Sequence, residues 1–163
     1  MVAISIILLF TPLWTVFSFT ETRTESPNIH YVSVNKEKLF QIKFTHSIHL
    51  TDVIESYELE PSRNIRLVSM EYEDVAIGMP SYAEEGQSLT YDNGVYTLRY
   101  DDAIIKDFAM YIGNVDYDLL FLYEGKVIDL KKELTKGDSY LFQAQKISLY
   151  EKMKGVKLNG RKK

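Results

Sequence analysis

The main part of the chain, from Ile29 onward, alternates apolar and polar residues with a period of two. Residues that favour turns recur about every ten positions. Such alternation is typical of strands with one buried face, and closely spaced turns are typical of antiparallel sheets. The pattern predicts an all-β fold over residues 29–150, mostly antiparallel and arranged as a barrel or a sandwich.

The first predicted hairpin joins a strand over residues 39–48 to a strand over residues 53–59. Apolar residues occupy the even positions of the first strand and the odd positions of the second. A slip of one residue would turn an apolar face toward water, so the pattern constrains the register. Pairing Ile48 with Val53 leaves a loop of four residues and satisfies both strands.

The second predicted hairpin turns at Asn93-Gly94, a sequence that favours a type I′ turn because both central residues need positive φ. This turn pairs Tyr91 with Tyr96 and Leu89 with Leu98. A further tight turn is predicted at residues 124–125.

Three later segments complete the predicted elements. Residues 104–112 and 118–123 are apolar enough for central strands. Over residues 140–153, alternation favours a strand through Ile147, and a helix would also fit.

The N-terminal segment has a different character, because residues 2–19 contain no charged side chain. As a helix they would extend about 27 Å, close to the hydrocarbon thickness of about 30 Å. We therefore expect a membrane anchor over residues 1–20 and a polar linker over residues 21–28. The alternative is a cleaved signal peptide, which would release a secreted domain. Two features disfavour it: no Lys or Arg precedes the apolar run, and the boundary near residues 17–20 lacks a small-x-small cleavage motif.

Charge is distributed unevenly along a chain whose net charge is −4. Residues 151–163 contain six basic residues and one acidic residue, so the preceding part of the chain is strongly acidic. An acidic domain does not suit nucleic-acid binding, which needs a cationic surface. We expect the basic C-terminal tail to be solvated, with contact to anionic lipid or wall polymer as the alternative.

Two polar residues fall on the apolar faces of the first hairpin. In the predicted register, His46 and Glu55 are direct cross-strand partners about 5 Å apart. A buried imidazole and carboxyl group must bond to each other or face a polar cavity. The pair therefore has three possible roles: a structural contact, part of a ligand or partner site, or part of a catalytic site.

Catalytic and metal chemistry receive little support from the remaining residues. Ser47 follows His46 on a strand and faces the opposite side, which disfavours a hydrolase. The three histidines lack established metal-ligand spacings, and the absence of cysteine excludes thiolate metal sites and cysteine nucleophiles. No phosphate-binding, dinucleotide-binding or G-x-S-x-G motif is present. We predict no enzyme activity, no metal and no cofactor.

Two motifs resemble those of one bacterial family, the domain of unknown function numbered 1850. The first motif combines His46 and Ser47 with Glu55 and Tyr57. The second, Gly-x-Gly-hydrophobe-Pro, matches at Gly78, Met79 and Pro80, and has Ala76 in place of its first glycine. The likeness spans roughly residues 39–147.

The resemblance implies a cellular location rather than a reaction. Genes of this family often lie beside those for tripartite ATP-independent periplasmic (TRAP) transporters of the TAXI type. We therefore expect an accessory protein on the extracytoplasmic side of the cytoplasmic membrane, anchored by residues 2–19, that contacts the permease or the binding protein. The alternative is a small-molecule-binding domain with a cavity lined by His46 and Glu55.

Overall fold

The computed structural model of the protein describes residues 9–75 and 78–162. Most of the described chain is β-strand, with two short helices near the C-terminal end. The elements are β1 (Trp14–Glu21), β2 (Ile29–Ser33), β3 (Leu39–Thr45), β4 (Asp52–Leu59), β5 (Ile65–Tyr72), β6 (Gln87–Asp92), β7 (Val95–Ile105), β8 (Asp107–Tyr111), β9 (Leu119–Tyr123), β10 (Lys126–Asp129), α2 (Leu130–Glu133), β11 (Ser139–Ile147), α3 (Leu149–Lys154), β12 (Val156–Lys157) and β13 (Arg161–Lys162).

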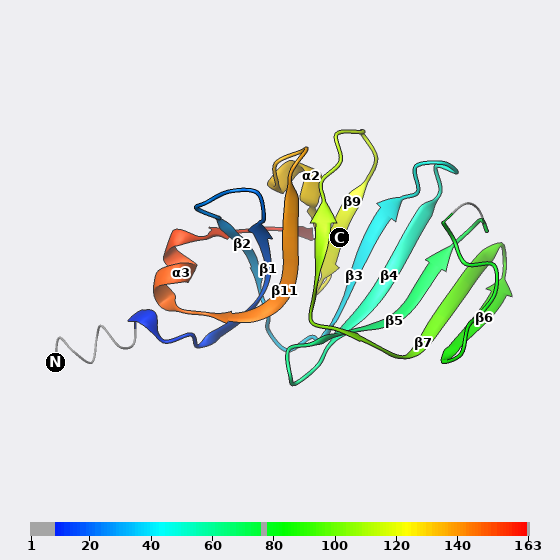
Figure 1. The fold of residues 1–163 in the computed structure, drawn as a ribbon, viewed down its shortest axis with the longest axis horizontal. Coiled ribbons are helices and arrows are strands. Elements are labelled where there is room, and N and C mark those ends of the chain that lie inside the picture. The colour runs from blue at the N-terminus through cyan, green and yellow to red at the C-terminus, as the bar shows by residue number, and fades with distance from the viewer. Residues whose placement is uncertain (1–8, 76–77, 163) are drawn as a thin grey trace.

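Two sheets pack face to face as a sandwich (Figure 1). The described strands form a five-stranded sheet in the order β12-β2-β1-β11-β8 and an eight-stranded sheet in the order β13-β10-β9-β3-β4-β5-β7-β6. Most neighbours are antiparallel, and β12 runs parallel to β2. The prediction of a mostly antiparallel all-β fold is confirmed; the sheets form a sandwich, and no closed barrel is present among the described strands.

The main core lies between the two sheets and is rich in aromatic rings. Phe17 of β1 contacts the rings of Phe40, Phe121, Tyr123 and Phe142 at centroid distances of 4.6–6.0 Å. All five side chains are buried. Aromatic pairs in such tilted and edge-on arrangements add packing energy beyond the area they bury.

The predicted transmembrane helix over residues 2–19 is wrong for Trp14–Phe19, which form most of β1. This strand lies inside the five-stranded sheet between β2 and β11. It is buried on both faces: Phe17 and Phe19 point into the main core, whereas Val16 packs with Tyr31 and Ile147 on the outer face. A strand covered on both sides needs apolar residues at successive positions, so its sequence resembles a membrane span.

The remainder of the predicted anchor is only partly described. Residues 2–8 lie outside the described residues. No helix within residues 9–75 and 78–162 combines the length and the hydrophobicity that a membrane span requires. Cleavage near residues 17–20 would remove most of β1, so the signal-peptide alternative in that form conflicts with the fold.

The predicted linker and the predicted basic tail are both parts of the domain. Residues 21–28 contain the loop between the paired strands β1 and β2. Residues 151–162 contribute to α3 and form β12 and β13, and Leu158 is buried. A Cβ atom on Gly160 would lie 2.9 Å from side-chain atoms of Ile128 and Lys126, so only glycine permits this close contact with β10. The basic segment is therefore part of the folded domain, with Lys154, Lys157 and Arg161 exposed on its surface.

Local turn signals predicted the later hairpins well. Asn93 and Gly94 have φ values of 49° and 87°, and the pairings Tyr91–Tyr96 and Leu89–Leu98 are confirmed. The tight turn at residues 124–125 is also confirmed.

The later apolar segments behave differently from one another. β9 is a central strand between β10 and β3 as expected. Residues 104–112 instead divide at Lys106 into the end of β7 and the edge strand β8, so the chain passes from one sheet to the other there.

Candidate functional site

The first hairpin has a different register from the predicted one. Phe44 pairs with Val53 and Ile42 pairs with Glu55. The strand β3 ends at Thr45, and the backbone N–H of His46 donates to Thr51 while that of Leu50 donates back to His46. Leu50 adopts a left-handed conformation with φ of 58°. The loop is therefore longer than predicted, and His46 belongs to the loop rather than to the strand.

His46 and Glu55 are consequently not cross-strand partners, and the proposed pair is not formed. Glu55 faces Ile42 on the inner side of the sheet and accepts a hydrogen bond of 2.7 Å from the hydroxyl of Tyr57. Burial raises the pKa of the Glu55 carboxyl group, and the hydrogen bond from Tyr57 partly offsets this increase. The pKa of Tyr57 is raised mainly by burial and, to a smaller extent, by the neighbouring Glu55 carboxylate.

The loop places His46 beside His49 instead. Their ring centroids are 5.7 Å apart. His49 Nδ1 lies 3.0 Å from a carboxylate oxygen of Asp74, in the segment after β5. The Nδ1 atom of His46 is buried and has no hydrogen-bond partner among the described residues.

The structure also shows the surroundings of Ser47 and of the histidines. Ser47 is exposed, and within the described residues it forms no hydrogen bond with a histidine, which a serine nucleophile would need. No group of three or more His, Asp or Glu side chains in the described part of the chain could hold a metal ion.

The second family motif lies near Glu55 on the same inner face. Gly78 has φ of 90°, a conformation that other residues rarely adopt. The carbonyl of Pro80 accepts a hydrogen bond of 2.6 Å from the hydroxyl of Tyr72, which holds this segment against β5. Met79 packs on the small core of Val53, Tyr72 and Leu98. Ala76 lies outside the described residues.

Tyr100 connects this segment to Glu55. It packs on the same small core as Met79. Burial raises the pKa of Tyr100, and the charge of Glu55 raises it further. Together, residues 78–82 and β7 enclose a pocket of about 460 Å³ lined by Tyr82, Leu98 and Tyr100. Glu55 and Tyr57 of the first motif thus share one tyrosine-rich face with the second motif, whereas His46 and Ser47 lie in the loop after β3. Neither His46 nor Glu55 lines that pocket.

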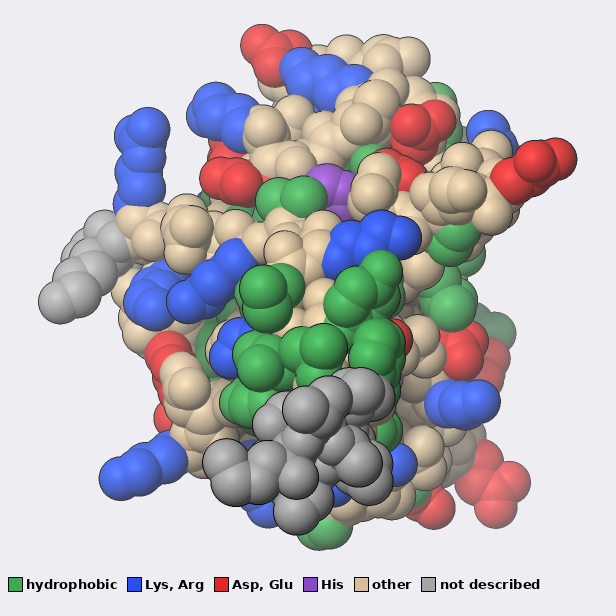
Figure 2. All heavy atoms as spheres, turned by 90° about the vertical axis from the view of Figure 1, so that its left-hand side faces the viewer, with side chains coloured by type: hydrophobic (Ala, Val, Ile, Leu, Met, Phe, Trp, Pro, Cys, Tyr) green, Lys and Arg blue, Asp and Glu red, His purple; other side chains and the backbone are tan. Residues whose placement is uncertain are grey.

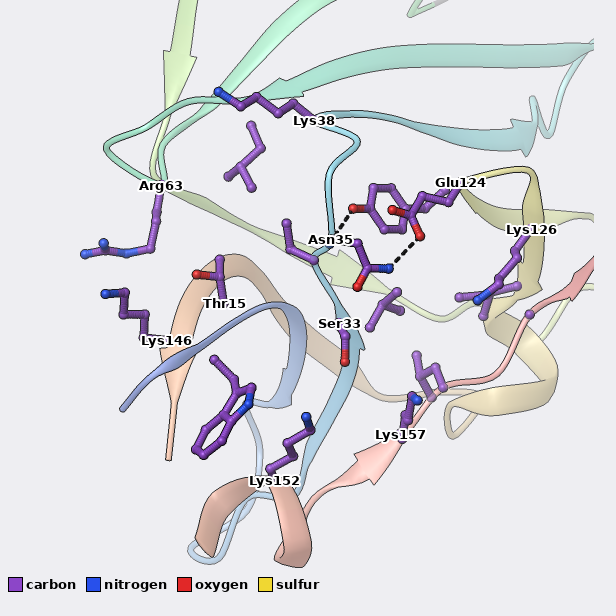
Figure 3. Close-up of a pocket in the computed structure, with 18 of the residues that line it drawn as sticks. Thr15, Ser33, Asn35, Lys38, Arg63, Glu124, Lys126, Lys146, Lys152 and Lys157 are labelled. Carbon is purple, nitrogen blue, oxygen red and sulfur yellow. Dashed lines mark hydrogen bonds between the residues drawn. The ribbon is translucent and has the colours of Figure 1, made fainter. Parts of the chain in front are cut away.

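A larger pocket of about 820 Å³ opens beside β1, β2 and the C-terminal segment (Figure 3). The polar side chains Thr15, Ser33 and Asn35 line it, together with two glutamates. Six cationic side chains also line it: Lys38, Arg63, Lys126, Lys146, Lys152 and Lys157.

Sequence reasoning did not identify this pocket. Its cations come from segments distributed between residues 38 and 157, and only Lys152 and Lys157 belong to the basic C-terminal run. That run is the one part of this pocket that the sequence alone indicates.

Figure 2 shows apolar side chains gathered at one end of the molecule, the end where Figure 1 places α3 and the N-terminal segment. The exposed fractions are 54% for Phe10, 53% for Leu13 and 75% for Met153. The rings of Phe10 and Tyr150 lie 5.1 Å apart, so the N-terminal segment and α3 form one surface. We call Phe10, Leu13, Tyr150 and Met153 the apolar end patch.

The fold thus defines a two-sheet antiparallel β-sandwich domain with a short helix, α3, beside the five-stranded sheet. Residues 40–130, more than half of the chain, match the family described as Domain of unknown function (DUF1850). The chain belongs to this family. Neither a curated protein nor a solved structure matches the chain.

Proposed function

We propose that this protein is a non-catalytic accessory domain at the extracytoplasmic face of the cytoplasmic membrane, with its α3 end toward the bilayer. The observation that carries the proposal is the apolar end patch. A cluster of exposed apolar side chains on a folded domain is typical of a surface that contacts protein or membrane. Here the cluster includes residues 10 and 13 of the apolar N-terminal segment.

The charges beside the patch also favour a bilayer. Lys152 and Lys154 are on α3, and Lys152 Nζ lies 5.3 Å from the centroid of the Trp14 ring. A tryptophan and lysines at the border of an apolar surface suit the headgroup region, where aromatic rings and basic side chains are both favoured. The predominantly acidic remainder of the chain would point away from anionic lipid.

The opposite end of the molecule is then available to a partner. Figure 1 shows β6 and β7 at the end farthest from α3. Tyr82 and Tyr91, with exposed fractions of 68% and 62%, lie in this part of the chain. Exposed tyrosines are enriched in protein interfaces because their rings bury much area with little loss of entropy.

The partner we propose is a TAXI-type TRAP transporter, since the family resemblance implies that association. Contact through the β6–β7 end favours the soluble binding protein over the permease, because this end is distant from the proposed bilayer surface. The earlier alternative, a cavity lined by both His46 and Glu55, is not retained because those residues do not meet.

Affinity purification of the full chain from membranes in mild detergent tests the partner. Transporter subunits should be recovered with the wild type, and Tyr82→Glu should reduce the recovered amount at least about fivefold, because a charge in an interface is poorly tolerated. Tyr111→Glu is the matched control, since Tyr111 is 56% exposed but lies on the edge strand β8. Preparations that repeatedly lack every transporter subunit would contradict the proposal.

A further inference from the structure

We propose that the large pocket beside β1 and β2 binds an anion that carries carboxylate or phosphate groups. We call the six cations that line it the basic pocket residues: Lys38, Arg63, Lys126, Lys146, Lys152 and Lys157. This site is separate from the tyrosine-rich face, and the inference does not depend on a transporter partner.

Charge is the first argument. The six cations face two carboxylates, Glu60 and Glu124, so the lining is strongly positive although the chain has a net charge of −4. Like charges gathered in a concave site raise the local potential and attract ligands of opposite charge.

The cations are also not neutralised by neighbours. None of the basic pocket residues forms an ion pair with a residue that the structure describes, whereas Lys43, Arg66 and Lys132 elsewhere each do. Glu124 of the lining instead accepts a hydrogen bond of 2.6 Å from the Asn35 side chain. The positive charge of the pocket is therefore available to a ligand.

The arrangement of the side chains favours a ligand with more than one anionic group. In the view of Figure 3, Lys38, Arg63 and Lys146 lie on one side of the pocket, and Lys126 and Lys157 lie on the other. Thr15 lies beside Arg63 and Lys146, Ser33 lies between the two groups, and both carry hydroxyl donors. Charge-assisted hydrogen bonds from lysine and arginine are the usual way to hold carboxylates and phosphates.

Two sources could supply this chemistry: a small soluble anion, or the headgroup of an anionic lipid. The second is sterically reasonable because Leu13 belongs both to the pocket lining and to the apolar end patch. The experiment must therefore distinguish a soluble anion from a lipid.

Trp14 provides the readout. It is the single tryptophan of the chain, it lines the pocket, and the ammonium group of Lys152 lies over its ring. The full chain in neutral detergent should show a saturable change in tryptophan emission when citrate or inorganic phosphate is added, with a dissociation constant below about 1 mM. Calorimetry with the same titrants would detect binding that leaves the indole unaffected.

The paired variant Lys38→Gln/Lys146→Gln should weaken binding about tenfold, and added NaCl should weaken it for the wild type. The control is Lys36→Gln/Lys136→Gln, which changes the net charge equally at exposed positions outside the pocket lining. Thermal unfolding of all variants confirms that they are folded.

Flotation with phosphatidylcholine vesicles, with and without phosphatidylglycerol, identifies the source. The pocket is supported as a headgroup site if flotation depends on phosphatidylglycerol and Lys38→Gln/Lys146→Gln removes that dependence. In that case neither citrate nor phosphate should bind. Binding of soluble anions that the same variant weakens supports it as a small-molecule site. The proposal is overturned if neither source binds, or if the pocket and control variants behave alike. A failure to recover transporter subunits by affinity purification would contradict the proposed function, and it would not contradict the anion site.

Discussion

Glu55 and Tyr57 lie two residues apart on β4 and share a hydrogen bond on the inner face of the eight-stranded sheet. Because burial raises the pKa of Glu55, the folded protein retains the carboxyl proton to a higher pH than the unfolded chain does. The raised pKa of Glu55 contributes to the free energy of unfolding, and this contribution is fully present below the pKa of the unfolded state. It is lost as the pH rises through the pKa of the folded state.

Glu55→Gln should remove this pH dependence, because the amide is neutral throughout and retains an oxygen that can accept the Tyr57 hydroxyl. The free energy of unfolding of the wild type, relative to that of the variant, should therefore fall as the pH rises. Urea denaturation at several values between about pH 4 and pH 8 measures the difference.

The exposed Glu85→Gln substitution is the control and should leave the pH dependence of the wild type unchanged. Parallel profiles for the wild type and Glu55→Gln would show that burial of Glu55 does not affect its titration in the folded state.

For single residues, the sequence pattern predicted the face of the sheet on which a side chain lies more accurately than it predicted the residue that the side chain contacts. Glu55 and Tyr57 point inward as their positions in the alternating pattern predicted. His46 did not follow the pattern, since alternation does not encode where a strand ends, and β3 ends at Thr45. The basic pocket residues depend on long-range topology, which no local pattern specifies.

Among the elements, β1 differs most from its predicted form. Its apolar residues serve two cores, one on each side of the five-stranded sheet. Ser18, a polar residue between them, is buried but satisfied: its hydroxyl donates to the carbonyl of Gln143 and accepts from the side chain of Gln145. β1 supplies only six of the 18 residues in the uncharged run 2–19, so the hydrophobicity of that run does not reveal the shorter strand within it.

Substitutions in β1 and just before it test this assignment. Phe17→Ala should reduce the free energy of unfolding by about 3–5 kcal/mol, because it leaves a cavity among four aromatic rings. Leu13→Ala should change it by less than about 0.5 kcal/mol, because Leu13 is largely exposed. Denaturant unfolding in neutral detergent measures both, and equal effects would contradict the placement of β1 in the core.

Elements with strong local signals were predicted more accurately. The type I′ turn at Asn93-Gly94 specifies the register of β6 and β7 by itself. Over residues 140–153, the strand through Ile147 is confirmed as β11, and the remaining ambiguity has a local explanation. The Ser148 hydroxyl accepts from the Glu151 backbone, and the Glu151 carboxylate accepts from the Ser148 backbone. This capping box begins α3 at Leu149, a signal readable in the sequence as S-x-x-E.

For the whole molecule, we propose one orientation, with the α3 end toward the bilayer. Figure 1 shows α3 at one end and β6 and β7 at the other, and the apolar side chains gather at the α3 end in Figure 2. The proposed bilayer contact and the proposed partner contact therefore occupy opposite ends of one sandwich.

The chain has no cysteine, so a single introduced thiol gives a specific label at either end. Met153→Cys and Tyr91→Cys, each carrying an environment-sensitive fluorophore, should be compared in vesicles that contain phosphatidylglycerol. We expect a blue-shifted emission that is protected from aqueous iodide at position 153, and a solvent-like emission that is readily quenched at position 91. Equal quenching at the two positions, or protection at position 91 alone, would contradict the proposed orientation.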